Sequence, residues 1–157
     1  MAIVQRRVTA KIEGDFVVFL IGMRFNRWWK VHKWLPIAVS MPKMLKELAA
    51  NPKSGFLGVQ PLGLTSMAQY WRSLDQLMAY AKDKEAKHLP AWRAFNRAVG
   101  TNGDVGIWHE TYRASPGSYE NIYVNMPAFG LGKVGSLQAA TGARQSAEGR
   151  LGATPTQ

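Results

Sequence analysis

The stretch FVVFLIGMRF, Phe16–Phe25, decides the fold expected of this 157-residue sequence. It is rich in β-branched and aromatic residues and follows the turn-like segment Glu13–Asp15, a pattern typical of a β-strand. Both of its sides are apolar, with Val17, Phe19, Ile21 and Met23 on one and Phe16, Val18 and Leu20 on the other. A strand with two apolar sides is normally covered on both. The sequence therefore predicts a sheet packed between two layers.

The composition excludes several classes of chemistry. The chain has no cysteine, so disulfides, thiolate metal sites, iron–sulfur clusters and a cysteine nucleophile are all ruled out. The longest apolar run, Phe16–Met23, is too short to span a bilayer, and the first residues lack the apolar core of a signal peptide. We therefore expect no transmembrane segment and a cytoplasmic location.

The formal net charge of +10 raises the question of an anionic partner. The densest basic stretch is RFNRWWKVHK, Arg24–Lys33, which is either a solvated face or a mouth that attracts an anionic ligand. RNA-recognition modules combine a ferredoxin-like sheet with high positive charge, but they carry a signature strand that Leu64–Arg72 does not match. Nucleic acid is therefore not the favoured partner.

The elements that follow the first strand can be placed from periodicity and capping. Apolar residues at helical spacing from Ile37 to Leu48 predict a helix with Pro36 in its first turn and an end at Asn51. Strands are expected at 55–60 and 64–72, and Ser73 with Gln76 forms the capping box of a second helix. A further helical piece is expected from Pro90 to Gly100, and DVGIWHETYR, 104–113, reads as the last strand.

The resulting order of strand, helix, strand, strand, helix, strand predicts an α+β fold of the ferredoxin-like, split βαβ type. Two helices cover only one face of such a sheet. Since the first strand is apolar on both sides, we expect a homodimer in which a second copy roofs the other face and encloses a barrel-like cavity. Residues 1–127 would form this domain, and 128–157 a Gly/Ala-rich C-terminal extension that partly wraps it, with the last dozen residues mobile.

Two apparent motifs carry little weight. GLGKVG, Gly130–Gly135, matches the dinucleotide-binding pattern but lacks the strand, helix and acidic residue that such a site requires, so it is read as a loop. The three histidines, His32, His88 and His109, have no metal-binding spacing, so no metal site is expected. One histidine alone could still be the axial ligand of a heme, either His88 or His109.

His109 is the leading candidate for proton transfer because an imidazole titrates near neutral pH. It alternates with Val105, Ile107 and Thr111, so it points either into the inter-subunit cavity or toward the helices as a core histidine. Arg24 lies on the first strand and could reach the edge of the same cavity, or simply pair with a carboxylate such as Glu110. The sequence alone does not decide between the two orientations of His109 or between the two roles of Arg24.

Four stretches give the chain a family resemblance: EGDFVVFLIGMRFN, YWRSLDQLMAYAKDKEAKHLPAWRAFNR, GIWHETY and NMPAFGLGKVG. Over about residues 8–137 they resemble a bacterial family of small proteins similar to the fumagillin-pathway monooxygenase, within the dimeric α+β barrel superfamily. That superfamily includes antibiotic-biosynthesis and heme-degrading monooxygenases, chlorite dismutases and aldoxime dehydratases. The resemblance implies a barrel dimer and oxygen chemistry in its cavity. In cofactor-independent relatives a substrate anion reacts with oxygen, which would make His109 the base and Arg24 the anion partner.

Three functions follow from these expectations. The first is a monooxygenase-like oxidoreductase that acts on an apolar small molecule in the barrel cavity, with the cofactor left open between none and heme. The second is a heme-binding enzyme of the same superfamily, either a monooxygenase or an aldoxime-dehydratase-like protein. The third is a module that binds a ligand without converting it.

Overall fold

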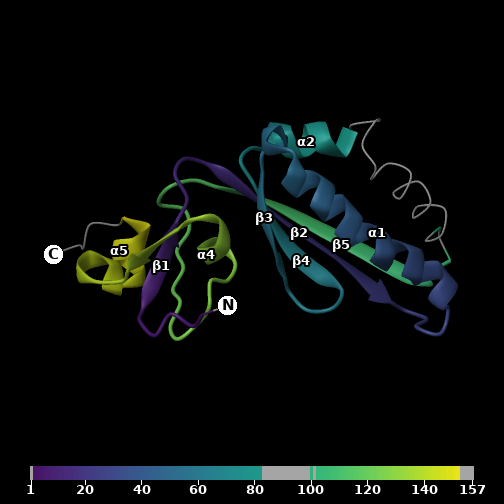
Figure 1. Cartoon of the computed structure of the whole chain (residues 1–157), viewed down its shortest axis with the longest axis horizontal. Coiled ribbons are helices and arrows are strands. Elements are labelled where there is room, and N and C mark those ends of the chain that lie inside the picture. Colours follow the sequence, from purple (N-terminus) through teal and green to yellow (C-terminus); the bar gives the residue numbers. More distant parts are fainter. Residues whose placement is uncertain (1, 83–99, 101, 153–157) are drawn as a thin grey trace.

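A four-stranded antiparallel sheet forms the centre of the protein. The computed structural model describes residues 2–82, 100 and 102–152 (Figure 1). The strands β2 (Phe16–Phe25), β3 (Phe56–Pro61), β4 (Ser66–Trp71) and β5 (Val105–Ala114) lie in the spatial order β3-β4-β2-β5. This order confirms the ferredoxin-like arrangement, in which the first strand of the motif lies inside the sheet between the third and the fourth.

The helices α1 (Val31–Ala50) and α2 (Leu74–Lys82) lie on one face of this sheet (Figure 1). α1 begins five residues before Pro36, so Pro36 and Pro42 are both inside the helix rather than at its start. Each proline removes one backbone hydrogen bond, yet the helix continues for 20 residues. The Ser73 hydroxyl accepts a hydrogen bond from the Gln76 amide at 3.2 Å, which confirms the predicted cap of α2. The helical piece predicted from Pro90 lies outside the described residues.

The helix-covered face has its core at one end of the sheet. Val17 from β2, Trp71 from β4, Leu48 from α1 and Leu77 from α2 are buried together, and Trp71 has no exposed surface. The indole N–H of Trp71 donates to Gln69 at 3.1 Å, so its polar atom is satisfied inside the core. The C-terminal end of α1 is therefore packed tightly on the sheet.

The opposite face is covered in part by the chain itself. Phe16, Ala68, Tyr70 and Ala114 are buried there with Ile12, and the residues packed over them include Tyr119, Leu131 and Val134. The GLGKVG segment contributes to this cover through the short helix α4 (Leu131–Val134). Burial raises the pKa of the Tyr70 phenol, which therefore stays protonated. At this end of the sheet, the layer over the second face is formed by the chain itself.

A second, two-stranded sheet joins the two ends of the chain. β1 (Val8–Lys11) pairs antiparallel with β6 (Ser136–Ala139), and both were missed by the sequence analysis, in which the His109 strand came last. The pairing joins residues on either side of the expected boundary at residue 127, although the boundary itself stays a prediction. A Cβ atom on Gly135 would lie 2.6 Å from the carbonyl oxygen of Lys11, so the close approach of the chains there requires glycine.

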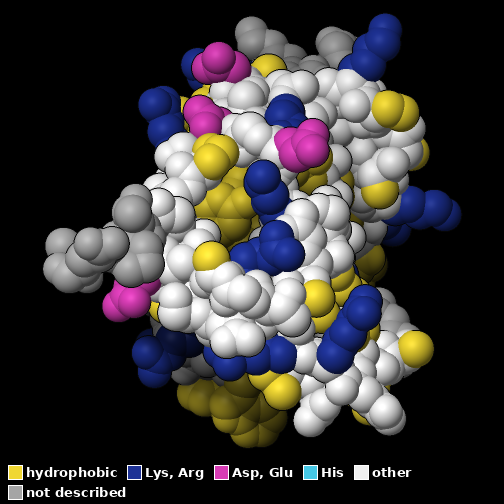
Figure 2. Space-filling view, turned by 90° about the vertical axis from the view of Figure 1, so that its left-hand side faces the viewer, with side chains coloured by type: hydrophobic (Ala, Val, Ile, Leu, Met, Phe, Trp, Pro, Cys, Tyr) yellow, Lys and Arg dark blue, Asp and Glu magenta, His cyan; other side chains and the backbone are white. Residues whose placement is uncertain are grey.

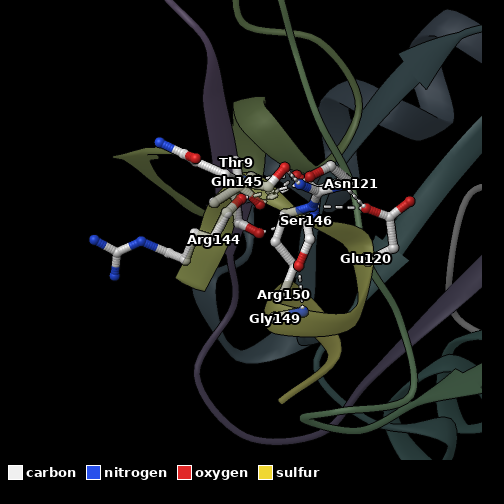
Figure 3. Close-up of polar contacts among 9 residues, drawn as sticks. Thr9, Glu120, Asn121, Arg144, Gln145, Ser146, Gly149 and Arg150 are labelled. Carbon is white, nitrogen blue, oxygen red and sulfur yellow. Dashed lines mark hydrogen bonds and ion pairs between the residues drawn. The ribbon is translucent and has the colours of Figure 1, made fainter. Parts of the chain in front are cut away.

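The C-terminal residues dock on this small sheet through one arginine. A 3₁₀ turn (Gly142–Gln145) leads into the helix α5 (Ala147–Leu151). The Arg150 guanidinium donates to the carbonyl oxygens of Arg144 and Gln145 and forms an ion pair with Glu120 at 2.6 Å (Figure 3). Because the Arg150 side chain is buried, removing one partner of this ion pair should destabilise the fold more than breaking a surface ion pair would. The mobility expected of the last dozen residues stays a prediction.

A buried carboxylate ties the loop after β2 to the start of β5. Asp104 is 1% exposed and forms ion pairs with Lys30 at 2.8 Å and Arg27 at 3.0 Å. Its carbonyl oxygen also accepts the backbone N–H groups of Asn26 and Arg27. The hydrogen bond from Lys30 is the main reason that the pKa of Asp104 lies below its ordinary value, although burial alone would raise it. The loop is thereby held at both ends.

Basic side chains are spread over the surface. Figure 2 shows the end of the molecule that holds β1 and α5, where Lys and Arg side chains are more numerous than acidic ones. In the part of the chain that the structure describes, no helix is long and apolar enough to cross a membrane.

Candidate functional site

The main candidate site is an apolar pocket between α1 and the sheet. Its volume is about 360 Å³, within the range of small-molecule sites. The wall is built from the middle of α1, the ends of β2 and β5, and the β3–β4 hairpin, by Ile21, Gly22, Met23, Ala38, Ser40, Met41, Pro42, Met44, Leu45, Pro61, Gly63, Leu64, Thr65, Ser66, Met67 and Ile107. Leu64 is fully exposed and also lines the pocket, so the pocket opens to solvent beside the hairpin.

The pocket lies under the middle of α1, between two ends that are both held. Near the start of the helix, Trp34 packs against Phe25 of β2 with the ring centroids 4.6 Å apart. Leu48 is buried against Val17 and Trp71, whereas the middle of α1 faces the sheet through smaller or flexible side chains. Ala38 and Ser40 contribute little volume, and Gly63 has no side chain to fill the space. A long helix over a short core therefore leaves a space rather than a packed interface.

The lining determines which ligands the pocket suits. Of the described residues, none with a charge lines it, and the residues of its wall that carry a hydroxyl group are Ser40, Thr65 and Ser66. Four methionines line the wall, and their unbranched thioethers adapt to irregular apolar shapes. The arrangement suits an apolar molecule that is oriented by one or two hydrogen bonds.

His109 lies on the same face of the sheet as the pocket, at its margin. In the β2–β5 register His109 is opposite Ile21, which lines the pocket, and it is two residues from Ile107, which also does. Its ring packs against Phe19 with the centroids 5.6 Å apart, and the residue is exposed. His109 therefore points to the face of the sheet that the helices cover, as one of the two alternatives held, but it is not buried in the core.

Arg24 lies on the other face of the sheet. It is opposite Gly106 in the register, and successive residues of a strand point to opposite faces. The structure therefore does not bring Arg24 and His109 together in one cavity within a protomer. Arg24 shares its face with Trp108, which is 41% exposed.

The pocket offers no histidine for heme among its described lining residues. A histidine-ligated heme requires an imidazole nitrogen that projects into an apolar slot. His109 is at the margin, and His88 lies outside the described residues. Heme ligation by His88 or His109 therefore stays a prediction. The described residues hold no group of three or more His, Asp or Glu side chains placed to bind a metal ion.

Sequence reasoning missed the pocket for an identifiable reason. Met41, Met44 and Leu45 follow the helical period and read as ordinary core positions. Whether such positions fill a core or line a space depends on the distance between helix and sheet, which no local pattern encodes. The available signals were the low volume of Ala38 and the number of methionines in the segment.

Comparison with known proteins agrees with this architecture. A family profile described as "Monooxygenase af470-like" matches residues 16–131. The protein "Monooxygenase af470" of Aspergillus fumigatus is 29% identical over 142 residues, which cover 77% of this chain and 46% of that protein. The chain thus spans about half the length of that relative, and no solved structure matches it. Since the family profile covers most of its residues, the chain belongs to the monooxygenase af470-like family.

Proposed function

We propose that this protein is a monooxygenase-like oxidoreductase that acts on an apolar small molecule bound between α1 and the sheet. The observation that carries the proposal is a pocket of about 360 Å³ whose described lining has no charged residue, in a chain of a family named for a monooxygenase. An apolar wall provides affinity through burial of the ligand, and a few hydroxyl groups set its orientation.

We assign the proton-transfer step to His109. The residue stands at the pocket margin on the strand that also contributes Ile107 to the wall. Its exposed ring can take a proton from an acidic C–H or O–H group of the substrate and release it to solvent. Loss of that proton makes the substrate electron-rich, which is the condition for a direct reaction with oxygen. Arg24 is not given a role in this step because it lies across the sheet from the pocket.

The experiment compares two histidine variants. His109→Gln should lower kcat for oxygen-dependent conversion by about 10²-fold or more, the usual contribution of a general base, and leave the Kd of the substrate nearly unchanged. His32→Gln is the matched control, because His32 is exposed on α1 and does not line the pocket. Unchanged turnover in His109→Gln would refute the assignment. Binding of the apolar ligand without product under oxygen would instead favour a sequestering module.

Absorption spectroscopy distinguishes the heme-dependent alternative from the cofactor-independent proposal. A Soret band in the purified protein, or one that develops when hemin is added, would favour it. Loss of that band in His109→Gln but not in His32→Gln would identify the ligand. A substoichiometric band that both variants retain would leave the cofactor-independent proposal in place.

The open part of the second sheet face supports a homodimer. Trp108 and Tyr112 are 41% and 52% exposed on β5, beside Leu20, and the C-terminal segment does not cover them. A second copy placed there would bury these aromatic rings. Sedimentation should give a dimer, and Trp108→Glu should convert it into a monomer. A wild-type protein that sediments as a compact monomer would refute this proposal.

A further inference from the structure

Two adjacent tryptophans are held outward in the turn between β2 and α1. Trp28 is 70% exposed and Trp29 is 60% exposed, although tryptophan is usually well buried. The turn is rigid, because the ion pairs of Asp104 hold Arg27 and Lys30 on either side of the two rings. The Trp34 indole N–H also donates to the carbonyl oxygen of Trp28 at 2.9 Å. A turn fixed in this way presents the indoles to a partner at little further cost in entropy.

The exposed apolar surface continues from this turn along α1. Val31, Leu35 and Val39 are 43%, 45% and 52% exposed and follow one another at a spacing of four residues. Residues at that spacing lie on one face of a helix. Pro42 is three residues further on, is also exposed, and lines the pocket. The stripe therefore leads to the pocket wall.

The β3–β4 hairpin lines the pocket across from α1 and is apolar at its tip. Leu62 is 44% exposed and Leu64 is fully exposed. The Met23 amide donates to the Thr65 carbonyl oxygen at 2.9 Å, which places the tip beside the end of β2 that leads to the tryptophan turn. Figure 1 shows the hairpin loop and the loop after β2 along the same lower edge. Exposed apolar residues thus stand on both sides of the pocket mouth.

The charge of this region has one sign. From Arg24 to Lys46 the chain has six Lys and Arg residues and no Asp or Glu. Asp104 offsets one of these charges. Lys43 and Lys46 are exposed on α1, and Lys46 lies seven residues after Val39, two turns along the same side of the helix.

We propose that this surface, the tryptophan turn with the α1 stripe and the hairpin tip, docks on an anionic lipid bilayer. Tryptophan favours the membrane interface, aliphatic residues enter the acyl boundary, and cations bind anionic headgroups. A nucleic acid would use the indoles and the cations but gain nothing from Val31, Leu35 and Leu64. A second copy of the chain would bring two basic surfaces of like charge together. Docked in this way, the pocket mouth faces the bilayer, from which an apolar ligand could enter directly.

The first test is vesicle flotation of the full chain. The protein should float with phosphatidylcholine vesicles that contain about 30% phosphatidylglycerol, bind weakly to phosphatidylcholine alone, and dissociate as salt rises. The measurement requires no turnover, so its failure is distinct from failure of the proposed function. Absence of association with the anionic vesicles at low salt would overturn the proposal.

Paired variants locate the surface. Trp28→Ala/Trp29→Ala should lower the partition coefficient on the order of tenfold, whereas the control Ile3→Ala/Val124→Ala, at two exposed apolar residues outside this surface, should not change it. Should the tryptophan variant fail to fold, as judged by its thermal melt, Leu62→Ser/Leu64→Ser tests the same surface at the hairpin tip. Equal binding by a folded docking-surface variant and by its control would overturn the proposal.

A second pair tests the charge. Lys43→Glu/Lys46→Glu should weaken binding by about fivefold or more for each residue, since one cation near an anionic surface contributes about 1 kcal/mol. Arg6→Glu/Arg7→Glu makes the same change in net charge at exposed residues just before β1 and should bind more tightly than the α1 variant.

Two further results would overturn the proposal. In the first, the wild type does not bind vesicles and the tryptophan variant changes its oligomeric state. In the second, the wild type does not bind vesicles but binds single-stranded RNA, and that binding requires the tryptophans.

Discussion

Filling the pocket provides the sharpest test of its position. In Ala38→Phe a phenyl ring is added to the α1 wall of a space of about 360 Å³. Forcing such a group into a filled core usually costs about 1–3 kcal/mol of unfolding free energy. Burying a phenyl ring in available space instead contributes roughly 1.5–3 kcal/mol, less the cost of ordering it. We therefore expect the unfolding free energy of Ala38→Phe to stay within about 1 kcal/mol of the wild type, or to rise.

The same substitution should weaken ligand binding. If the ring denies a ligand only about 60 Å² of apolar wall, the loss is about 1.5 kcal/mol at 25 cal/mol per Å². That loss corresponds to a roughly tenfold higher Kd. The assay is a fluorescence titration with a neutral naphthylamine dye, combined with urea denaturation. Ala49→Phe is the control because Ala49 is exposed on the same helix and does not line the pocket. A destabilised Ala38→Phe protein that binds the dye as tightly as the wild type would refute the pocket.

Three further predictions concern stability and packing. Because the pKa of Asp104 is lowered in the folded protein, its ion pairs stabilise the fold above the ordinary carboxyl pKa near 3.8, and this stabilisation is lost as pH falls below it. The melting temperature of the wild type should therefore decrease below about pH 4. Asp104→Asn should melt at a lower temperature at neutral pH, and its melting temperature should depend less on pH in the acid range. Arg150→Ala should speed amide exchange in residues 142–152 and leave the four-stranded sheet protected, whereas global destabilisation would show that the two sheets unfold together. A Cβ atom on Gly22 would lie 2.6 Å from the Trp108 indole nitrogen. Gly22→Val should therefore lower the unfolding free energy by about 1–3 kcal/mol and change the near-ultraviolet circular dichroism. An unchanged spectrum would show that the indole does not lie on that glycine.

The elements that the sequence predicted well are those with a strong local pattern. Phe16–Phe25 is a strand with the expected bounds, and the Ser73–Gln76 cap stands where its spacing indicated. β1 and β6 were missed because each has only four residues and its partner lies more than 120 positions away. The start of α1 was placed too late because Pro36 was assigned to the first turn, although the helix tolerates it further inside.

The candidate site was less predictable because it depends on the pairing of strands. The sequence indicated that His109 lies on the side of Val105 and Ile107, but it could not indicate which side of β2 that would be. The register that pairs Ile21 with His109 and Arg24 with Gly106 separates the two expected site residues by the thickness of the sheet. A shift of one residue in the pairing of β5 with β2 would have moved His109 to the face that carries Arg24.

By itself the sequence determined that strands and helices follow one another in the ferredoxin-like order, that the central strand is apolar on both sides, and which family the chain resembles. These properties follow from apolar residues spaced by two residues in strands and by about 3.6 residues in helices, and from short local motifs. Neither signal depends on residues far apart in the chain. The tertiary structure alone decided that α1 stands off the sheet to leave a pocket, that His109 borders it, and that the chain covers part of its own second face. Each of these depends on register and on the spacing between layers, which are set by contacts between residues far apart in the chain.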